Sequence, residues 1–214
     1  MQLQKSQTEL TTAATDAVLA IVCMVIAWWL LDARPSWTRT VWIWLFTLTA
    51  LASVLGAAAH GLALTDRARN ALWQPLYLSL GLTIALLVMA GVSDWKGEAL
   101  ARTWLPWALA VGVGFYALTN VLSGAFIVFV AYEAIAMVLV LGIYVTLWTV
   151  RGLPGAPLIV AGIGLSIVAA VVQATTMTAR VVVTFDHNGL FHLIQLVGMV
   201  VLAAGVRALL LHGQ

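Results

Sequence analysis

Three histidines and two acidic residues lie in strongly apolar parts of this chain, where an ionisable side chain is costly and marks a candidate functional site. The histidines are His60, His187 and His192, and the acidic residues are Asp16 and Glu133. Imidazole and carboxylate groups are typical ligands of catalytic zinc, which leaves one position open for water. We therefore take the histidines as a candidate zinc set, with Glu133 or Asp16 as the base or as a group that orients a ligand.

Amide side chains accompany these groups and could bind a ligand or cofactor. The candidates are Gln74, Asn120, Gln173 and Asn188. Asn188, His192 and Gln195 recur at i, i+4 and i+7, which places them on one face of a helix. The alternative for Asn120 and Gln173 is a hydrogen bond between neighbouring helices.

The acidic residues also allow simpler interpretations. Asp16, together with Thr15, could cap the start of a helix instead of serving a site, and Asp186 is expected to be a helix cap or a loop charge. Glu133 is different because it lies roughly 12 Å into its apolar segment at 1.5 Å per residue. A carboxylate at such a depth costs about 2.5–3.5 kcal/mol, so it needs a partner or a proton.

Seven apolar segments must position these residues. The chain is 63% hydrophobic and 8% charged, with a mean hydropathy of +1.05, so lipid must be its solvent. Because a helix of about 20 residues crosses the hydrocarbon core, we expect an all-α bundle of seven transmembrane helices forming a single domain, 1–214. The expected spans are 13–31, 40–63, 71–93, 103–121, 125–150, 155–178 and 187–210.

The two faces of this bundle differ in composition. Successive spans alternate in direction, so all the candidate site residues fall in the half nearer the N-terminus, here called the N-terminal face. Nine of the ten tryptophans fall on the opposite, C-terminal face, and only Trp73 does not. Tryptophans anchor helices at membrane interfaces. Gly162, Ser166, Ala169 and Gln173 form a stripe of mostly small residues suited to close helix packing.

Charge restricts partners and orientation. The formal net charge is +2, too small and scattered for a nucleic-acid surface, so the expected partners are membrane lipid and a small-molecule or lipid ligand. Six of the ten basic residues fall on the C-terminal face and four on the N-terminal face. The positive-inside rule then predicts that the N-terminus lies outside and the C-terminus in the cytoplasm.

The layout resembles the CREST superfamily of alkaline ceramidases, hemolysin III-like proteins and progestin and adiponectin receptor-like proteins. That superfamily has seven spans, a serine four residues before a histidine late in span two, an aspartate opening span three, and H-x-x-x-H opening span seven. Here His60 matches the histidine, whereas Gly56 and Gln74 stand at the serine and aspartate positions, and span seven offers Asn188-x-x-x-His192. The stretches HNGLFHLIQ and YEAIAMVLVLGIY are also similar to an uncharacterised bacterial seven-span family, a resemblance that implies a location in a bacterial inner membrane.

The resemblance implies a zinc-dependent hydrolase of a lipid amide or ester. A non-enzymatic sensor or transporter that uses the same polar pocket without metal remains the alternative. A b-type haem held by His60 and His192, or a proton relay of histidine and glutamate, would also use these residues. A retinal protein is excluded because span seven has no lysine.

Overall fold

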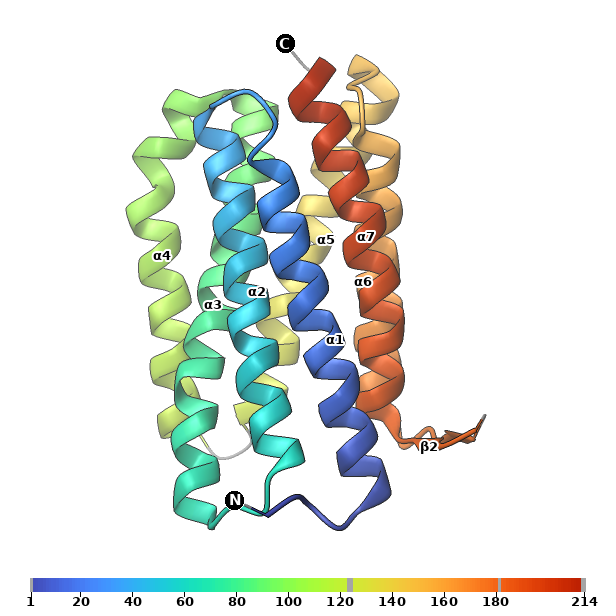
Figure 1. Cartoon of the computed structure of the whole chain (residues 1–214). Coiled ribbons are helices and arrows are strands. Elements are labelled where there is room, and N and C mark those ends of the chain that lie inside the picture. The colour runs from blue at the N-terminus through green and yellow to red at the C-terminus, as the bar shows by residue number, and fades with distance from the viewer. Residues whose placement is uncertain (1, 123–124, 181, 213–214) are drawn as a thin grey trace.

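Seven helices form an up-and-down bundle in this computed structural model, which describes residues 2–122, 125–180 and 182–212. All seven are long and apolar enough to span a membrane, and this confirms the expected all-α seven-helix class. The two chain ends lie at opposite ends of the bundle (Figure 1). The helices are α1 (Gln7–Leu30), α2 (Trp37–Gly61), α3 (Asp66–Lys96), α4 (Glu98–Val121), α5 (Ala125–Arg151), α6 (Ala156–Gln173) and α7 (His187–His212).

Polar residues outside the apolar segments set several helix ends. The hydroxyls of Ser6, Ser36 and Thr65 accept backbone N–H groups in the first turns of α1, α2 and α3, which satisfies donors that the helix leaves free. α1 therefore begins at Gln7, before the expected residue 13. This start places Asp16 inside the helix, so its interpretation as a helix cap was wrong.

The sixth span is shorter than expected. The prediction 155–178 was wrong at its end, because α6 stops at Gln173. The Thr175 hydroxyl donates to the Val172 carbonyl and accepts from the Met177 N–H, a local arrangement that competes with the helix. A small hairpin follows, in which β1 (Ala179–Arg180) pairs antiparallel with β2 (Thr184–Phe185). It projects sideways from the N-terminal face (Figure 1).

Close packing holds α6 against α7. A Cβ atom added at Gly162 would lie 2.7 Å from the backbone nitrogen of Leu202, and one at Gly205 would lie 2.7 Å from that of Ile159. Only glycine allows so close an approach, so the expected small-residue stripe does serve helix contact. By contrast, α4 lies at the outer edge of the bundle (Figure 1).

The half of the bundle nearer the C-terminal face is solidly packed. Its largest fully buried side chains include Trp42, Phe46, Tyr144, Leu30 and Leu147. The expected tryptophan belt is present in most of its members, such as Trp28 at 73% and Trp107 at 67% exposed, but Trp42 belongs to the core, at 0%. The side chains that could form a site lie in the other half.

Candidate functional site

A cavity of about 430 Å³ lies within the bundle and is lined by residues of α1, α2, α3, α5, α6 and α7. Within the described part of the chain, α4 contributes nothing to its wall. On α2 the wall runs from His60 to Leu45, roughly 22 Å of helix at 1.5 Å per residue. The polar wall residues gather toward the N-terminal face, and the deeper ones, such as Leu45 and Leu202, are apolar.

The first polar group of the wall joins α1 to α7. The Asp16 carboxylate lies 3.3 Å from Nε2 of His192, and the Thr15 hydroxyl lies 3.1 Å from Nδ1 of the same ring. Both side chains of the Asp16–His192 pair are nearly buried, at 6% and 9% exposed. Because both ring nitrogens have partners, the imidazole is held in one orientation.

Gly56 on α2 makes room for this pair. A Cβ atom at Gly56 would lie 2.6 Å from Oδ2 of Asp16, closer than any real Cβ contact. Any larger residue at this position, four residues before His60, where the resemblance would place a serine, would have to displace the Asp16 carboxylate.

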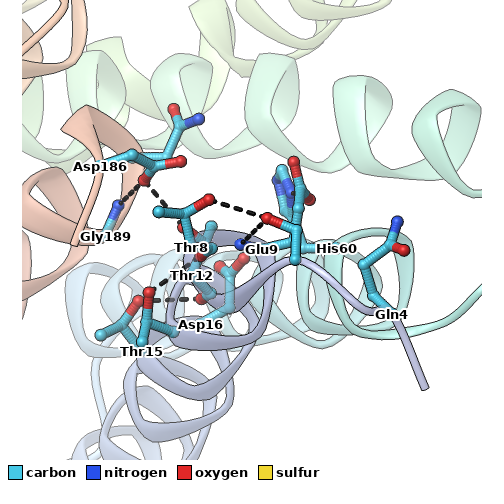
Figure 2. Close-up of polar contacts among 12 residues, drawn as sticks. Gln4, Thr8, Glu9, Thr12, Thr15, Asp16, His60, Asp186 and Gly189 are labelled. Atoms are coloured by element: carbon cyan, nitrogen blue, oxygen red, sulfur yellow. Dashed lines mark hydrogen bonds and ion pairs between the residues drawn. The ribbon is translucent and has the colours of Figure 1, made fainter. Parts of the chain in front are cut away.

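A second pair joins α1 to α2 nearer the N-terminal face. Nδ1 of His60 lies 2.8 Å from Oε2 of Glu9, and Figure 2 shows the two residues side by side. The ring of Trp73 meets the His60 ring edge-on at 5.6 Å between centroids. This pair is more open than the first, with 17% of His60 and 34% of Glu9 exposed.

Asp186 fastens the start of α7 to α1, and is the helix cap that was expected. Its Oδ1 accepts the Gly189 N–H at 2.9 Å and the Thr12 hydroxyl at 3.0 Å (Figure 2). The Thr11 hydroxyl also donates to the Thr184 carbonyl of β2 at 2.9 Å. The hairpin is thereby tied to α1 beside the cavity.

Glu133 on α5 is the exception among these acidic groups. It is 8% exposed and lines the cavity. Its Oε2 has no hydrogen-bond partner among the described residues. Phe129 and Met137, one turn to either side on the same helix, also line the cavity, so Glu133 presents an unengaged carboxyl group to an otherwise apolar stretch of wall.

The amide candidates divide into two groups. Gln173 and Asn188 line the cavity and form a long hydrogen bond, 3.4 Å, between α6 and α7. Asn120 is exposed and donates to the Tyr116 carbonyl of its own helix. Gln74 is half-buried but lies outside the cavity wall, to which its neighbours on α3 contribute instead. Asn120 and Gln74 are therefore not part of the site as the structure forms it.

The three histidines line one cavity without converging. His60 pairs with Glu9 and His192 with Asp16, while His187 lies at the first turn of α7. Over residues 2–122, 125–180 and 182–212, no three histidine, cysteine, aspartate or glutamate side chains come together as a metal site would require. The three imidazoles expected to hold zinc are therefore not gathered around one point among these residues.

Several functional contacts could not be expected from the spans alone. Glu9 lies outside the predicted first span, 13–31, and Thr12 and Thr15 are neutral residues in the first half of α1. His192 also borders a second apolar pocket of about 240 Å³ between α1, α7 and β2. The imidazole thus stands between the interior cavity and the outer surface of the bundle.

The chain belongs to DUF6962, a family of unknown function, whose sequence model matches residues 11–211. No curated protein and no solved structure matches the chain.

Proposed function

Because family membership supplies no activity, we propose from the geometry that this integral membrane protein binds a small amphipathic molecule in its cavity, as a sensor or transporter. One observation carries the proposal, namely the cavity of about 430 Å³ with an unengaged carboxyl group, that of Glu133, in its wall. Small-molecule sites in proteins have volumes of roughly 300–1,000 Å³, mostly apolar walls and a few convergent polar groups. The volume and the mostly apolar wall of this cavity fit that description, and Asp16, Glu133 and His192 are among its polar groups.

The polar groups favour binding over metal-dependent hydrolysis. His60 and His192 are each held by a carboxylate of α1, and such pairs fasten helices to one another around the cavity. The hydrolase suggested by the CREST resemblance would need the histidines to converge on one ion. A sensor or transporter needs only the pocket and helices that separate or close around it.

The orientation proposed for the protein is N-terminus outside and C-terminus in the cytoplasm of a bacterial inner membrane. The basis is the excess of basic residues on the C-terminal face, six against four. The cavity would then lie nearer the outer side. A phosphatase reporter, active only outside the cytoplasm, should be inactive when fused after Gln214. Activity of that fusion would reverse the orientation.

Filling the cavity tests the binding proposal. Ser53 lines the cavity, whereas its neighbour Val54 is 55% exposed toward lipid. Ser53→Phe should place a ring inside the site, and Val54→Phe should place the same ring outside it. A ligand that binds only the folded state raises the unfolding temperature by mass action.

The measurement uses purified protein in phosphatidylcholine nanodiscs with ten-carbon probes that differ only in their head group: decylamine, 1-decanol and decanoate. We expect at least one probe to bind saturably and to stabilise the wild type and Val54→Phe, but not Ser53→Phe. Failure of all three probes to bind the wild type saturably would contradict the proposed function.

A further inference from the structure

Glu133 differs from the other acidic groups near the cavity in having no partner of its own. Asp16 is held with His192 and Glu9 with His60, while Oε2 of Glu133 is buried and unbonded within the described chain. Buried polar atoms in proteins are nearly always hydrogen-bonded. Because Glu133 also lines the cavity, a molecule bound there is placed to supply the missing partner.

The charges of the residues that line the cavity indicate the sign of the charge on that partner. Two carboxyl groups line the cavity, those of Asp16 and Glu133, and the wall described by the structure contains no lysine or arginine. An anionic head group would meet these acids without a permanent positive charge to balance it. A cationic head group would supply Glu133 with a charge-assisted hydrogen bond, which is about twice as strong as a neutral one.

The aromatic residues that line the cavity also favour a positively charged head group. Trp73 and Tyr77 stack at 5.9 Å between ring centroids, and both line the cavity. Phe129 lies one turn from Glu133 on α5 and lines it as well. The faces of aromatic rings attract organic cations, with a strength that increases when water is excluded.

The remaining wall is suited to an apolar body. Leu45, Leu87 and Leu202 line the cavity from three different helices beyond the polar end. A molecule with a polar head near Glu133 and a hydrocarbon portion among these residues would bury its apolar surface, at a gain of roughly 25 cal/mol per Å².

We propose that the ligand is a lipophilic amine, whose ammonium group is bound by the Glu133 carboxylate and whose hydrocarbon portion lies in the apolar part of the cavity. This inference rests on the proposed binding function and names its ligand class. It requires no covalent step. The amine is a cation at neutral pH in the same way as a lysine side chain.

The test compares the dissociation constants of decylamine, 1-decanol and decanoate, measured by titration calorimetry in phosphatidylcholine nanodiscs, with empty nanodiscs subtracted. The three probes share a chain length and differ in head-group charge. We expect decylamine to bind the wild type roughly tenfold or more tightly than 1-decanol, and decanoate to bind least. The wild-type ranking decides the ligand class without any variant.

Two substitutions then assign the preference to one carboxylate. Glu133→Gln keeps the shape of the side chain and should remove the advantage of decylamine over 1-decanol, while leaving the affinity for 1-decanol unchanged. Glu98→Gln removes the same charge from the C-terminal face, where Glu98 is paired with Arg102, and should change neither affinity.

The outcomes separate this inference from the proposed function. Equal affinities for 1-decanol and decylamine, both abolished by Ser53→Phe, would overturn the proposal that the ligand is an amine. The proposal that the cavity binds a ligand would stand. An amine preference that survives in Glu133→Gln would overturn the role of Glu133. Absence of saturable binding by all three probes would overturn the binding function itself, and the inference with it.

Discussion

The two ends of the bundle differ in what their polar residues hold together. At the C-terminal face, guanidinium groups donate hydrogen bonds to backbone carbonyls. Arg39 donates to the Leu31 and Ala33 carbonyls, and Arg207 donates to that of Trp29. At the N-terminal face, side chains pair with side chains across helices, as in Asp16–His192. The C-terminal end is therefore a packed anchor, and the N-terminal end has side-chain pairs that join helices around a cavity.

This difference indicates which part of the molecule can move. The C-terminal half contains the fully buried Trp42 and Tyr144, and the Tyr144 hydroxyl is bonded to Asp94 at 2.6 Å. Packed interiors of this kind resist deformation. The half nearer the N-terminal face contains the cavity and its polar pairs, so we expect any movement linked to the proposed binding to take place there.

The largest expected effect is at the packed end. Trp42→Ala should lower the free energy of unfolding by about 3–5 kcal/mol, because it leaves a cavity where a fully buried ring was packed. Trp44, two residues along, is 56% exposed, and Trp44→Ala should cost about 0.5 kcal/mol or less. Unfolding in mixed micelles by added dodecyl sulfate measures both. Equal costs would contradict the description of this end as a packed anchor.

The next largest effect concerns the fit of Asp16 against α2. Gly56→Ala should destabilise the protein by about 1–3 kcal/mol, because the added methyl group overlaps the Asp16 carboxylate. The matched control is Gly164→Ala in α6, where an added Cβ meets nothing within 4 Å. That change should be neutral, or stabilising by up to about 1 kcal/mol through helix propensity. The same unfolding assay applies, and a Gly56→Ala variant as stable as the control would refute the contact.

At Glu133 the expected change has the opposite sign. Glu133→Met should raise the free energy of unfolding of the ligand-free protein by about 1–3 kcal/mol, since it replaces an unpaired buried carboxyl group with an apolar group of similar shape. Asp16→Leu should instead destabilise, because it leaves His192 buried without its partner. Destabilisation by both substitutions, measured without added ligand, would mean that Glu133 has a structural partner.

The bundle could be predicted from sequence because lipid imposes one strong requirement, a run of about 20 apolar residues. The helix ends were harder, since capping residues such as Ser6 and Thr65 lie outside the apolar windows. Depth along a helix could also be predicted, and His60, Glu133 and His192, which were expected at one depth, line one cavity.

Rotation about the helix axis and the choice of partner could not be predicted in the same way. Asn120 has a depth suited to the site but is exposed on α4, a helix whose described residues do not line the cavity. The carboxylate that binds His60 is Glu9, which lies before the first predicted span. Pairing between helices depends on tertiary packing, and a single sequence with no contact information does not determine it.

The smallest effect is expected at the more exposed of the two pairs, Glu9–His60. With 34% of its side chain exposed, Glu9 is partly hydrated, and such pairs contribute up to about 1 kcal/mol. Glu9→Gln should therefore lower the free energy of unfolding by less than about 1 kcal/mol, well below the loss in Asp16→Leu. Added salt should reduce the contribution further, since exposed charges are screened within about 8–10 Å at physiological ionic strength. Unfolding of the wild type and Glu9→Gln at low and high salt gives the difference directly. A loss as large as that of Asp16→Leu, unaffected by salt, would show that the Glu9–His60 pair is as well shielded from solvent as the Asp16–His192 pair.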